Sequence, residues 1–216
     1  HFDTNWAYGT ASYSKGVVIL DQLSHIVGQK VIDKSLKRYF DEWAYKHPNA
    51  SDFKRIVEKE SGIELDWYFE YFVNTTKTID YSIHEIIGDE KGTQILLKKG
   101  EMPMPVEFNI VLQNGTVSKY YIPTVLMRGE KEVELNTKIL SDWAWTNPYY
   151  SIRLDQAPSE IKEIQLHTTG HIADIEPLND RVKMPDNWDW NKYKLRLNLL
   201  EKKKKGTIKK FVKIKK

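Results

Sequence analysis

The chain of 216 residues is long enough for one large domain or two small ones. Its 40% apolar and 29% charged residues are typical of a globular protein, and 7 Trp, 12 Tyr and 7 Phe argue against disorder over most of the length. The absence of cysteine excludes a disulfide scaffold, a thiolate zinc site and a cysteine nucleophile. Because no apolar run approaches the roughly 18 to 20 residues that span a bilayer, we expect no integral membrane segment.

The net charge of +3 conceals an uneven distribution along the chain. Residues 192–216 carry 12 basic side chains and one acidic side chain, so the remaining body is mildly acidic. Such a tail could bind phosphates by counterion release or lie on an anionic membrane. However, Tyr193, Leu195, Leu197 and Leu199 alternate with polar residues as in an edge strand, and lysines commonly protect such edges. We favour a solvated tail or a protected edge and expect no nucleic-acid partner.

Four helices are expected up to residue 77, over residues 12–27, 30–46, 51–61 and 64–73. Apolar residues cover so much of the first helix that it should be buried, with Gly28 as its C-cap. Ser51 is the expected N-cap of the third helix, which should end at Gly62. The fourth holds five aromatic residues within six positions, so we expect it to be covered on several sides, with a second domain as one candidate cover.

After Thr78 the apolar period changes from helical to two, which indicates strands. Strands are expected near residues 79–83, 94–97, 106–112, 117–126, 132–135 and 161–166. Asn114-Gly115 predicts a type I′ hairpin turn, which requires positive φ at both residues. Several short strands separated by turns favour an antiparallel sandwich.

The predicted fold class is therefore α+β, with an N-terminal helical bundle followed by an antiparallel β-sandwich. The predicted divisions are residues 1–77 for the helical part, 78–175 for the sandwich and 176–216 for a C-terminal extension with the basic tail.

Three histidine positions invite a chemical interpretation, and each has a simpler one. His84-Glu85 begins like a zinc-binding H-E-x-x-H, but position 88 is glycine and the segment has strand periodicity. His167 and His171 have a zinc-binding spacing, but poor helix formers separate them and no acidic third ligand stands at a recognisable spacing, so we favour a surface turn. His25 lies with Ser24 and Asp21 on one helix, which cannot form a triad, and a helix-packing role is favoured.

An ordered series of short motifs is more specific than any of these. It comprises Tyr13-Ser14-Lys15-Gly16, Gly28, residues 34–40, Asp52-Phe53, Glu60-Ser61-Gly62, residues 65–69 and Phe72-Val73. The series resembles the C-terminal half of the catalytic domain in the alanyl aminopeptidase family of gluzincin zinc metallopeptidases. In that family a Y-x-K-G motif begins a helix after the zinc site, a later S-G-x-x-L-D-x-x-F helix follows, and then a small β-sandwich. The resemblance covers residues 1 to about 175 and implies that the helical part is the C-terminal half of a thermolysin-like catalytic domain.

The resemblance implies a catalytic role for Tyr13, whose hydroxyl would donate a hydrogen bond to the oxyanion formed when zinc-activated water attacks a peptide carbonyl. A neutral phenol with a pKa near 10 suits that role. Lys15 and Gly16 are interpreted as motif and packing residues without chemistry.

The family's H-E-x-x-H, its distant glutamate ligand and its G-x-M-E-N motif do not occur in these residues. We therefore expect a C-terminal fragment of a zinc-dependent aminopeptidase that is inactive alone and binds no catalytic zinc. Its expected partners are a peptide substrate and the N-terminal remainder of the same protein. The family favours an extracytoplasmic location, periplasmic or secreted.

A non-enzymatic reading remains open, because a peptidase-derived scaffold with a β-sandwich can serve as a protein-interaction module after its chemistry is lost. A third hypothesis is binding to nucleic acid or an anionic surface through the tail.

Overall fold

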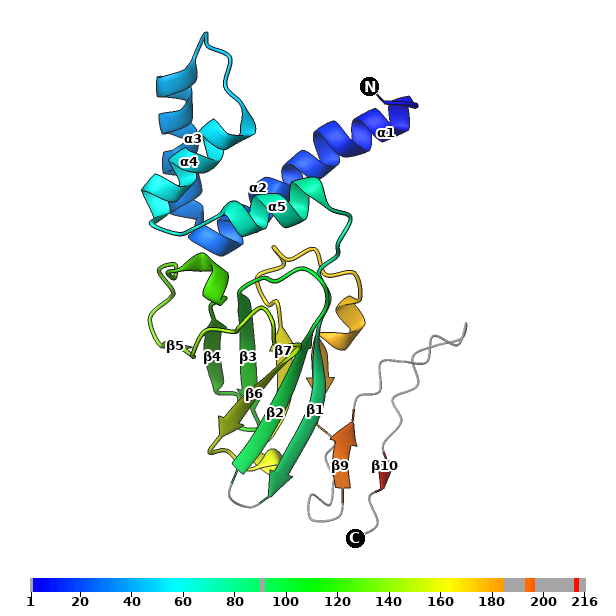
Figure 1. Ribbon diagram of the computed structural model, residues 1–216. Coiled ribbons are helices and arrows are strands. Elements are labelled where there is room, and N and C mark those ends of the chain that lie inside the picture. Colours follow the sequence, from blue (N-terminus) through cyan, green and yellow to red (C-terminus); the bar gives the residue numbers. More distant parts are fainter. Residues whose placement is uncertain (1, 90–91, 185–192, 197–211, 214–216) are drawn as a thin grey trace.

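The computed structural model describes residues 2–89, 92–184, 193–196 and 212–213. Helices occupy the N-terminal part of the chain and stand at one end of two β-sheets (Figure 1). This arrangement confirms the α+β class.

The helical part contains α1 (Asn5–Gly9), the π-helical segment η1 (Thr10–Ser14), α2 (Lys15–Val27), α3 (Gln29–Trp43), α4 (Ala50–Ser61) and α5 (Asp66–Asn74). The glycines after α2 and α4 end these helices as predicted, because Gly28 has φ +93° and Gly62 has φ +71°. The prediction of Ser51 as an N-cap is wrong. Asn49 caps α4 instead: its Oδ1 accepts hydrogen bonds from the backbone N–H groups of Ser51 and Asp52 at 2.9 and 3.2 Å.

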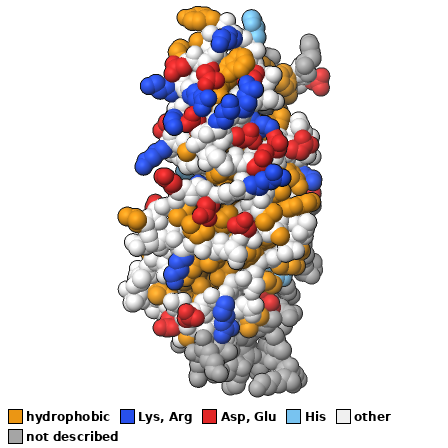
Figure 2. Space-filling model, turned by 60° about the vertical axis from the view of Figure 1, so that its left-hand side comes forward, with side chains coloured by type: hydrophobic (Ala, Val, Ile, Leu, Met, Phe, Trp, Pro, Cys, Tyr) orange, Lys and Arg blue, Asp and Glu red, His pale blue; other side chains and the backbone are white. Residues whose placement is uncertain are grey.

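Charged side chains join α3 to α4 on the outer surface of the helical part. Glu60 of α4 accepts from Arg38 of α3 at 2.7 Å and lies 2.5 Å from Lys34 Nζ. These contacts lower the pKa of Glu60, first through Lys34 and then through Arg38. Figure 2 shows acidic and basic side chains interspersed over this end of the molecule, with apolar side chains between them.

The strands form two five-stranded sheets with the orders β10-β9-β1-β2-β6 and β5-β4-β3-β7-β8 within the described residues. Their bounds are β1 (Tyr81–Asp89), β2 (Gly92–Lys99), β3 (Val106–Leu112), β4 (Val117–Ile122), β5 (Thr137–Ile139), β6 (Tyr149–Leu154), β7 (Ile161–Leu166), β8 (Arg181–Lys183), β9 (Tyr193–Arg196) and β10 (Val212–Lys213). Short 3-10 helices occur at η2 (Val125–Met127), η3 (Pro158–Glu160) and η4 (Pro177–Asn179). The pairings are antiparallel except that of β4 with β5, which is parallel, so the second sheet is mixed.

The turn between β3 and β4 differs from the type I′ prediction. Gly115 has φ +86°, but Asn114 has no positive φ. The Gly115 N–H donates to the Leu112 carbonyl at 3.0 Å, and the Leu112 N–H donates to the Thr116 carbonyl at 2.8 Å. These bonds define a longer hairpin loop with glycine in the left-handed position.

The strand predicted at residues 132–135 does not form. The short strand β5 begins at Thr137 instead, after a turn in which Asn136 has φ +70°. Four residues of alternating pattern do not by themselves set a register, and here β5 takes its place from the parallel pairing of Lys119 with Thr137.

One hydrophobic core connects the helices with both sheets. Leu23 and Ile26 of α2 belong to the same buried cluster as Ile83 of β1 and Phe108 of β3. The aromatic helix α5 is covered on several sides as expected: Trp67 and Tyr68 are buried, and the other three aromatic residues pack against the core. Because this one cluster contains residues of the helices and of both sheets, the helical part packs directly against the sandwich.

The C-terminal segment contributes strands to both sheets. β8 pairs with β7, and β9 lies between β1 and β10. The strand predicted at Tyr193 and Leu195 is present as β9, but its edge position is wrong, because β10 pairs with its outer side. Leu197, Leu199 and the lysine run 202–205 lie outside the described residues. The three-part division of the chain stays a prediction. No helix of the described residues combines the length and apolar character needed to cross a bilayer.

Candidate functional site

Tyr13 lies in the middle of a long helix, not at its head as predicted. The helix begins at Asn5, because the Thr4 side chain caps it by accepting from the Ala7 N–H at 3.0 Å. It continues through η1 into α2 (Figure 1). Trp6, Tyr8 and Tyr13 are too few to establish an apolar helical period in this first stretch, so the predicted helix begins seven residues late, at residue 12 instead of Asn5.

Tyr13 occupies a π-helical turn. The N–H of Lys15 donates to the carbonyl of Thr10, five residues earlier, which is the π-helical pattern. Such a turn inserts one residue into an α-helix and rotates the side chains on one side of it against those on the other. Single π-helical turns are found frequently at functional sites.

The Tyr13 side chain is 64% exposed, and Tyr8 is its aromatic neighbour, with ring centroids 5.8 Å apart in an edge-to-face arrangement. A side-chain hydrogen bond to Tyr13 raises the pKa of Tyr8 above its usual value. The ring contact and this hydrogen bond make Tyr8 the neighbour that holds Tyr13 in place on the exposed side of the helix.

The expectation that the first helix is buried holds only for its C-terminal half. Gln22 to Val27 are buried, whereas Trp6 is 79% and Val17 68% exposed. Figure 1 shows this N-terminal half extending beyond the rest of the molecule. An exposed apolar surface of this kind usually marks a site of contact with other protein.

Of the two motif residues after Ser14, Lys15 packs against α5, whereas Gly16 faces open space. Lys15 Nζ lies 5.1 Å from the centroid of the Phe72 ring in α5. A Cβ added to Gly16 would meet no atom within 4 Å. The packing role predicted for Gly16 is therefore not met by the described residues.

Helix α5 holds α2 in place through a buried tyrosine. The Tyr68 hydroxyl lies 3.0 Å from the Ile19 carbonyl and 3.2 Å from Gln22 Oε1. Burial raises the pKa of Tyr68 far above its usual value, so the phenol stays protonated and can donate to these acceptors.

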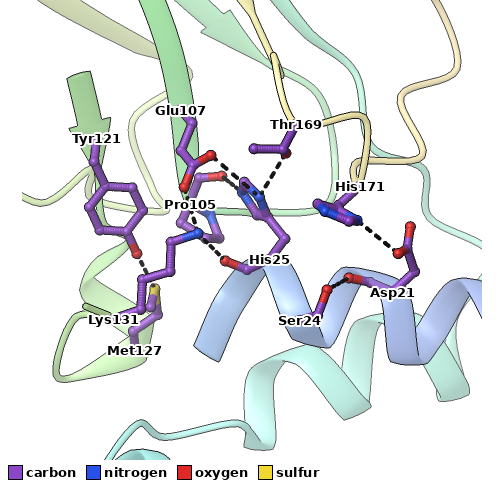
Figure 3. Close-up of polar contacts among 10 residues, drawn as sticks. All are labelled: Asp21, Ser24, His25, Pro105, Glu107, Tyr121, Met127, Lys131, Thr169 and His171. Carbon is purple, nitrogen blue, oxygen red and sulfur yellow. Dashed lines mark hydrogen bonds and ion pairs between the residues drawn. The ribbon is translucent and has the colours of Figure 1, made fainter. Parts of the chain in front are cut away.

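His25 joins α2 to the sandwich and has the packing role that the sequence favoured (Figure 3). Its Nε2 lies 3.1 Å from the Pro105 carbonyl and must donate, which leaves Nδ1 as acceptor for Thr169 Oγ1 at 3.5 Å. Burial, followed by the charge of Lys131, lowers the pKa of His25 to about 3. The ring is therefore neutral at physiological pH.

Lys131 and Glu107 complete this contact between α2 and the sandwich, and sequence reasoning did not find them. Lys131 Nζ donates to the His25 carbonyl at 2.6 Å and lies 2.5 Å from Glu107 Oε1. Figure 3 shows the Lys131 Nζ between the Glu107 carboxylate and the His25 carbonyl at the end of α2. Its partners are distant in sequence and form no motif, so no local signal could have identified it.

The predicted surface turn at His167 and His171 is correct for His171 alone. His171 is exposed, and its Nδ1 lies 2.8 Å from Asp21 Oδ1. His167 is buried, and its ring points to a different neighbour: Nε2 lies 3.8 Å from Asp174 Oδ2. Asp180 joins this group, so acidic partners exist that the spacing did not reveal. The two histidines therefore do not share one site.

The remaining candidates stay apart from Tyr13. His84 lies in β1, with its ring 5.1 Å from that of Tyr149, in agreement with the strand prediction. Two surface hollows lie at α4–α5 and at the start of the chain, and Tyr13 lines neither. Among the described residues, neither group of metal-ligating side chains includes a neighbour of Tyr13.

Comparison with known proteins shows what the N-terminal third of the chain is similar to. Residues 1–72 match the Peptidase family M1 domain, and these residues contain the helix of Tyr13, all of α2 to α4 and most of α5. The chain thus resembles the M1 metallopeptidases, which are zinc enzymes, and the predicted resemblance is confirmed.

Two curated proteins are similar to parts of the chain. Tricorn protease-interacting factor F2 of Thermoplasma volcanium is 28% identical over 116 residues, which cover 50% of this chain and 14% of that protein. Aminopeptidase B of Rattus norvegicus is 34% identical over 76 residues, which cover 35% of this chain and 10% of that protein. The matched segment therefore spans only a small part of each relative.

Proposed function

We propose that the chain forms the C-terminal portion of a zinc-dependent aminopeptidase that hydrolyses N-terminal residues from peptides. In this proposal Tyr13 donates a hydrogen bond to the oxyanion of the tetrahedral intermediate. The observation that supports it most directly is the exposed Tyr13 hydroxyl on a π-helical turn, within the segment that matches the M1 domain.

We also propose that the described residues do not supply the zinc ligands of such an enzyme. The His84-Glu85 pair lies in a strand and lacks a second histidine, and the buried His167 group lies in the sandwich. The residues present therefore do not fit the catalytic metal, and we assign its ligands to protein outside these 216 residues. Zinc, when bound in such an enzyme, polarises the carbonyl and activates water.

Tyr13 contributes to the reaction by position and protonation. Its side chain is exposed beside the Tyr8 ring, so its phenol is accessible to an external acceptor. A preorganised donor aimed at developing negative charge is worth about 10² to 10³ in rate. Tyr8 acts as a positioning residue in this arrangement.

The exposed apolar half of the helix supports the same proposal. Trp6, Tyr8 and Val17 all expose apolar surface along this half of the helix, and such a patch commonly marks a contact with other protein. We assign the missing contact to the N-terminal remainder of the peptidase domain, since the matched segments cover only 14% and 10% of the two relatives. The open space above Gly16 would lie in that contact.

The test compares Tyr13→Phe with the unchanged full-length protein on an aminoacyl-arylamide substrate. We expect kcat to fall by about 10² to 10³ with zinc content and KM nearly unchanged. Tyr45→Phe is the matched control, because Tyr45 is fully exposed at the end of α3 and touches no part of this helix. Near-normal turnover of Tyr13→Phe would refute the assigned role.

A non-catalytic interaction module remains the alternative, supported by the same exposed apolar surface. If the full-length protein folds, binds no zinc and shows no turnover, this alternative replaces the enzyme proposal.

A further inference from the structure

The segment between β7 and β8 contains a buried group of polar side chains that the peptidase proposal does not use. It runs from His167 to Asp180 and lies between the sandwich and the helices, where Thr169 and His171 contact α2 (Figures 1 and 3). His167 begins this segment with φ +50°, a left-handed conformation that is uncommon outside glycine, although histidine adopts it more often than most residues.

His167 is the central member of the group. Its side chain is only 5% exposed, yet neither Nδ1 nor Nε2 has a hydrogen-bond partner. Leaving both nitrogens of a buried imidazole unpaired is costly, because the ring has lost its hydration without replacement. One side of the ring packs edge-on against Tyr81, with centroids 5.5 Å apart.

Two aspartates face this imidazole. One ligand atom each from His167, Asp174 and Asp180 can be chosen so that all three lie within 4.8 Å of one another. Asp180 is also buried, and its Oδ1 has no hydrogen-bond partner. Its burial, together with the charges of Asp174 and Asp80, raises its pKa to about 8. None of these influences on Asp180 comes from a cation of the protein.

Backbone groups orient the aspartate nearest to the histidine. Asp174 Oδ2 accepts from the Tyr81 N–H at 2.7 Å, and Oδ1 accepts from the Glu176 N–H at 2.8 Å. Each carboxylate oxygen has a second lone pair, so these two bonds orient the Asp174 carboxylate and still leave it able to bind an ion. Metal-binding carboxylates are commonly held in this way by a second shell of hydrogen bonds.

We propose that His167, Asp174 and Asp180 bind a divalent transition-metal ion, with zinc as the reference ion. The 3.8 Å between His167 Nε2 and Asp174 Oδ2 suits two ligands of one ion, since ligand bonds of about 2.1 Å allow separations up to about 4.2 Å. One imidazole nitrogen with two carboxylates is a donor set that such ions accept. The ion would give one nitrogen of His167 and the Asp180 carboxylate a partner together, and it would neutralise the two carboxylates.

The proposed ion has a structural role. It would tie the segment 167–180 to the start of β1, because Asp174 also binds the Tyr81 backbone. The same segment contacts His25 through Thr169 and Asp21 through His171. Metal binding would therefore stabilise the contact between the segment 167–180 and α2.

A second group of acidic residues shows why the His167 group is preferred. Glu58, Glu64 and Asp66 also lie close together, but they are not deeply buried. Glu58 accepts from the Leu65 N–H at 2.9 Å, and Asp66 pairs with Lys54. Glu58 and Asp66 already have partners and the cluster is not deeply buried, so it does not point to an ion.

The experiment measures metal in the untagged 216-residue chain, which has no H-E-x-x-H motif to contribute background. The protein is stripped with EDTA, incubated with zinc chloride, desalted and assayed by inductively coupled plasma mass spectrometry. We expect about one zinc per chain, and a higher Tm with zinc than after EDTA treatment.

Three variants locate the ion. His167→Gln and the nearly isosteric Asp180→Asn should each lose zinc by at least tenfold and lose the zinc-dependent rise in Tm. His171→Gln is the matched control, because this exposed histidine lies in the same segment and should leave the zinc content unchanged. Near-ultraviolet circular dichroism checks that each variant is folded.

The proposal is overturned if the unchanged chain retains no zinc above its buffer. It is also overturned if His171→Gln removes zinc as strongly as His167→Gln, or if folded Asp180→Asn retains it fully. Both ligand variants, His167→Gln and Asp180→Asn, are measured so that a folding defect in His167→Gln does not decide the result.

Discussion

Acid should destabilise the protein through His25, the buried residue that joins α2 to the sandwich. We compare the unchanged chain with His25→Gln between pH 7.5 and pH 5.0. Glutamine can place its Nε2 near the Pro105 carbonyl and donate the same hydrogen bond, but it does not titrate. The difference between the two proteins therefore isolates the protonation of one ring.

The size and sign of the effect follow from the pKa of His25. The pKa is about 3 in the folded protein, mainly through burial and then through Lys131, against about 6.5 in the unfolded chain. The unfolded chain takes up the proton first, so the contribution of His25 is fully present above the unfolded pKa and is lost as the pH falls from about 6.5 toward 3. At pH 5.0 this linkage costs about 2 kcal/mol, and it approaches about 5 kcal/mol below pH 3.

The neighbouring charges act in both directions. Lys131 and His171 lower the pKa of His25, while the Pro105 hydrogen bond and the Asp21 charge raise it. These effects are included in the pKa of about 3, and burial remains the largest of them.

Other buried groups make the variant comparison necessary. His167 also has a pKa lowered to about 3 by burial, so it adds a loss of the same sign. Asp180 acts oppositely: its pKa is raised to about 8, so its stability contribution is present below the unfolded pKa near 4 and is lost as the pH rises toward 8. The total pH dependence is therefore a sum of opposing effects, whereas the difference between the two proteins is not.

Urea unfolding followed by tryptophan fluorescence measures this difference, because Trp67 and Trp143 are buried in the core. From pH 7.5 to 5.0, the unchanged chain should lose about 2 kcal/mol more of its unfolding free energy than His25→Gln loses. The reasoning is refuted if the gap between the two proteins stays constant over this range.

Two further predictions concern the same part of the molecule. Lys131→Met should lower the unfolding free energy by about 2 kcal/mol, because it leaves the half-buried Glu107 carboxylate without its cation. The control Lys119→Met removes an exposed ion pair and should change the unfolding free energy little in the same urea titration. Gly16→Ala should stabilise the isolated chain by up to about 1 kcal/mol and so raise its Tm, because the added methyl group meets no atom. Gly62→Ala should lower the Tm, because Gly62 has φ +71°, which alanine adopts only with strain. A lower Tm for Gly16→Ala would show that the described surface above that residue is not open in solution.

The helices and strands were largely predictable because their apolar periods are local. The strand at residues 161–166 was predicted with its observed bounds, and α2 to α5 lie close to their expected ranges. The errors fall where local pattern is weak. The start of the first helix has no apolar period, and the short strand near residue 137 takes its place from pairing with β4.

The candidate site divides in the same way. Tyr13 was found because its motif and the motifs after it are contiguous in sequence, and the match of residues 1–72 to the M1 domain rests on the same order. Its position in a π-helical turn was not predictable, because no residue pattern in the sequence indicates where a hydrogen bond spans five residues instead of four.

The sequence by itself determined the α+β class, the order of helices before strands and the resemblance to a zinc peptidase, since each depends on residues near one another in the chain. Only the tertiary structure decided which polar side chains meet. Lys131 reaches the carbonyl of His25, and Asp180 reaches His167, through backbone paths that no local period describes. Burial then sets the charge of these groups, because removal from water penalises the ionised form and depends on every element packed around it.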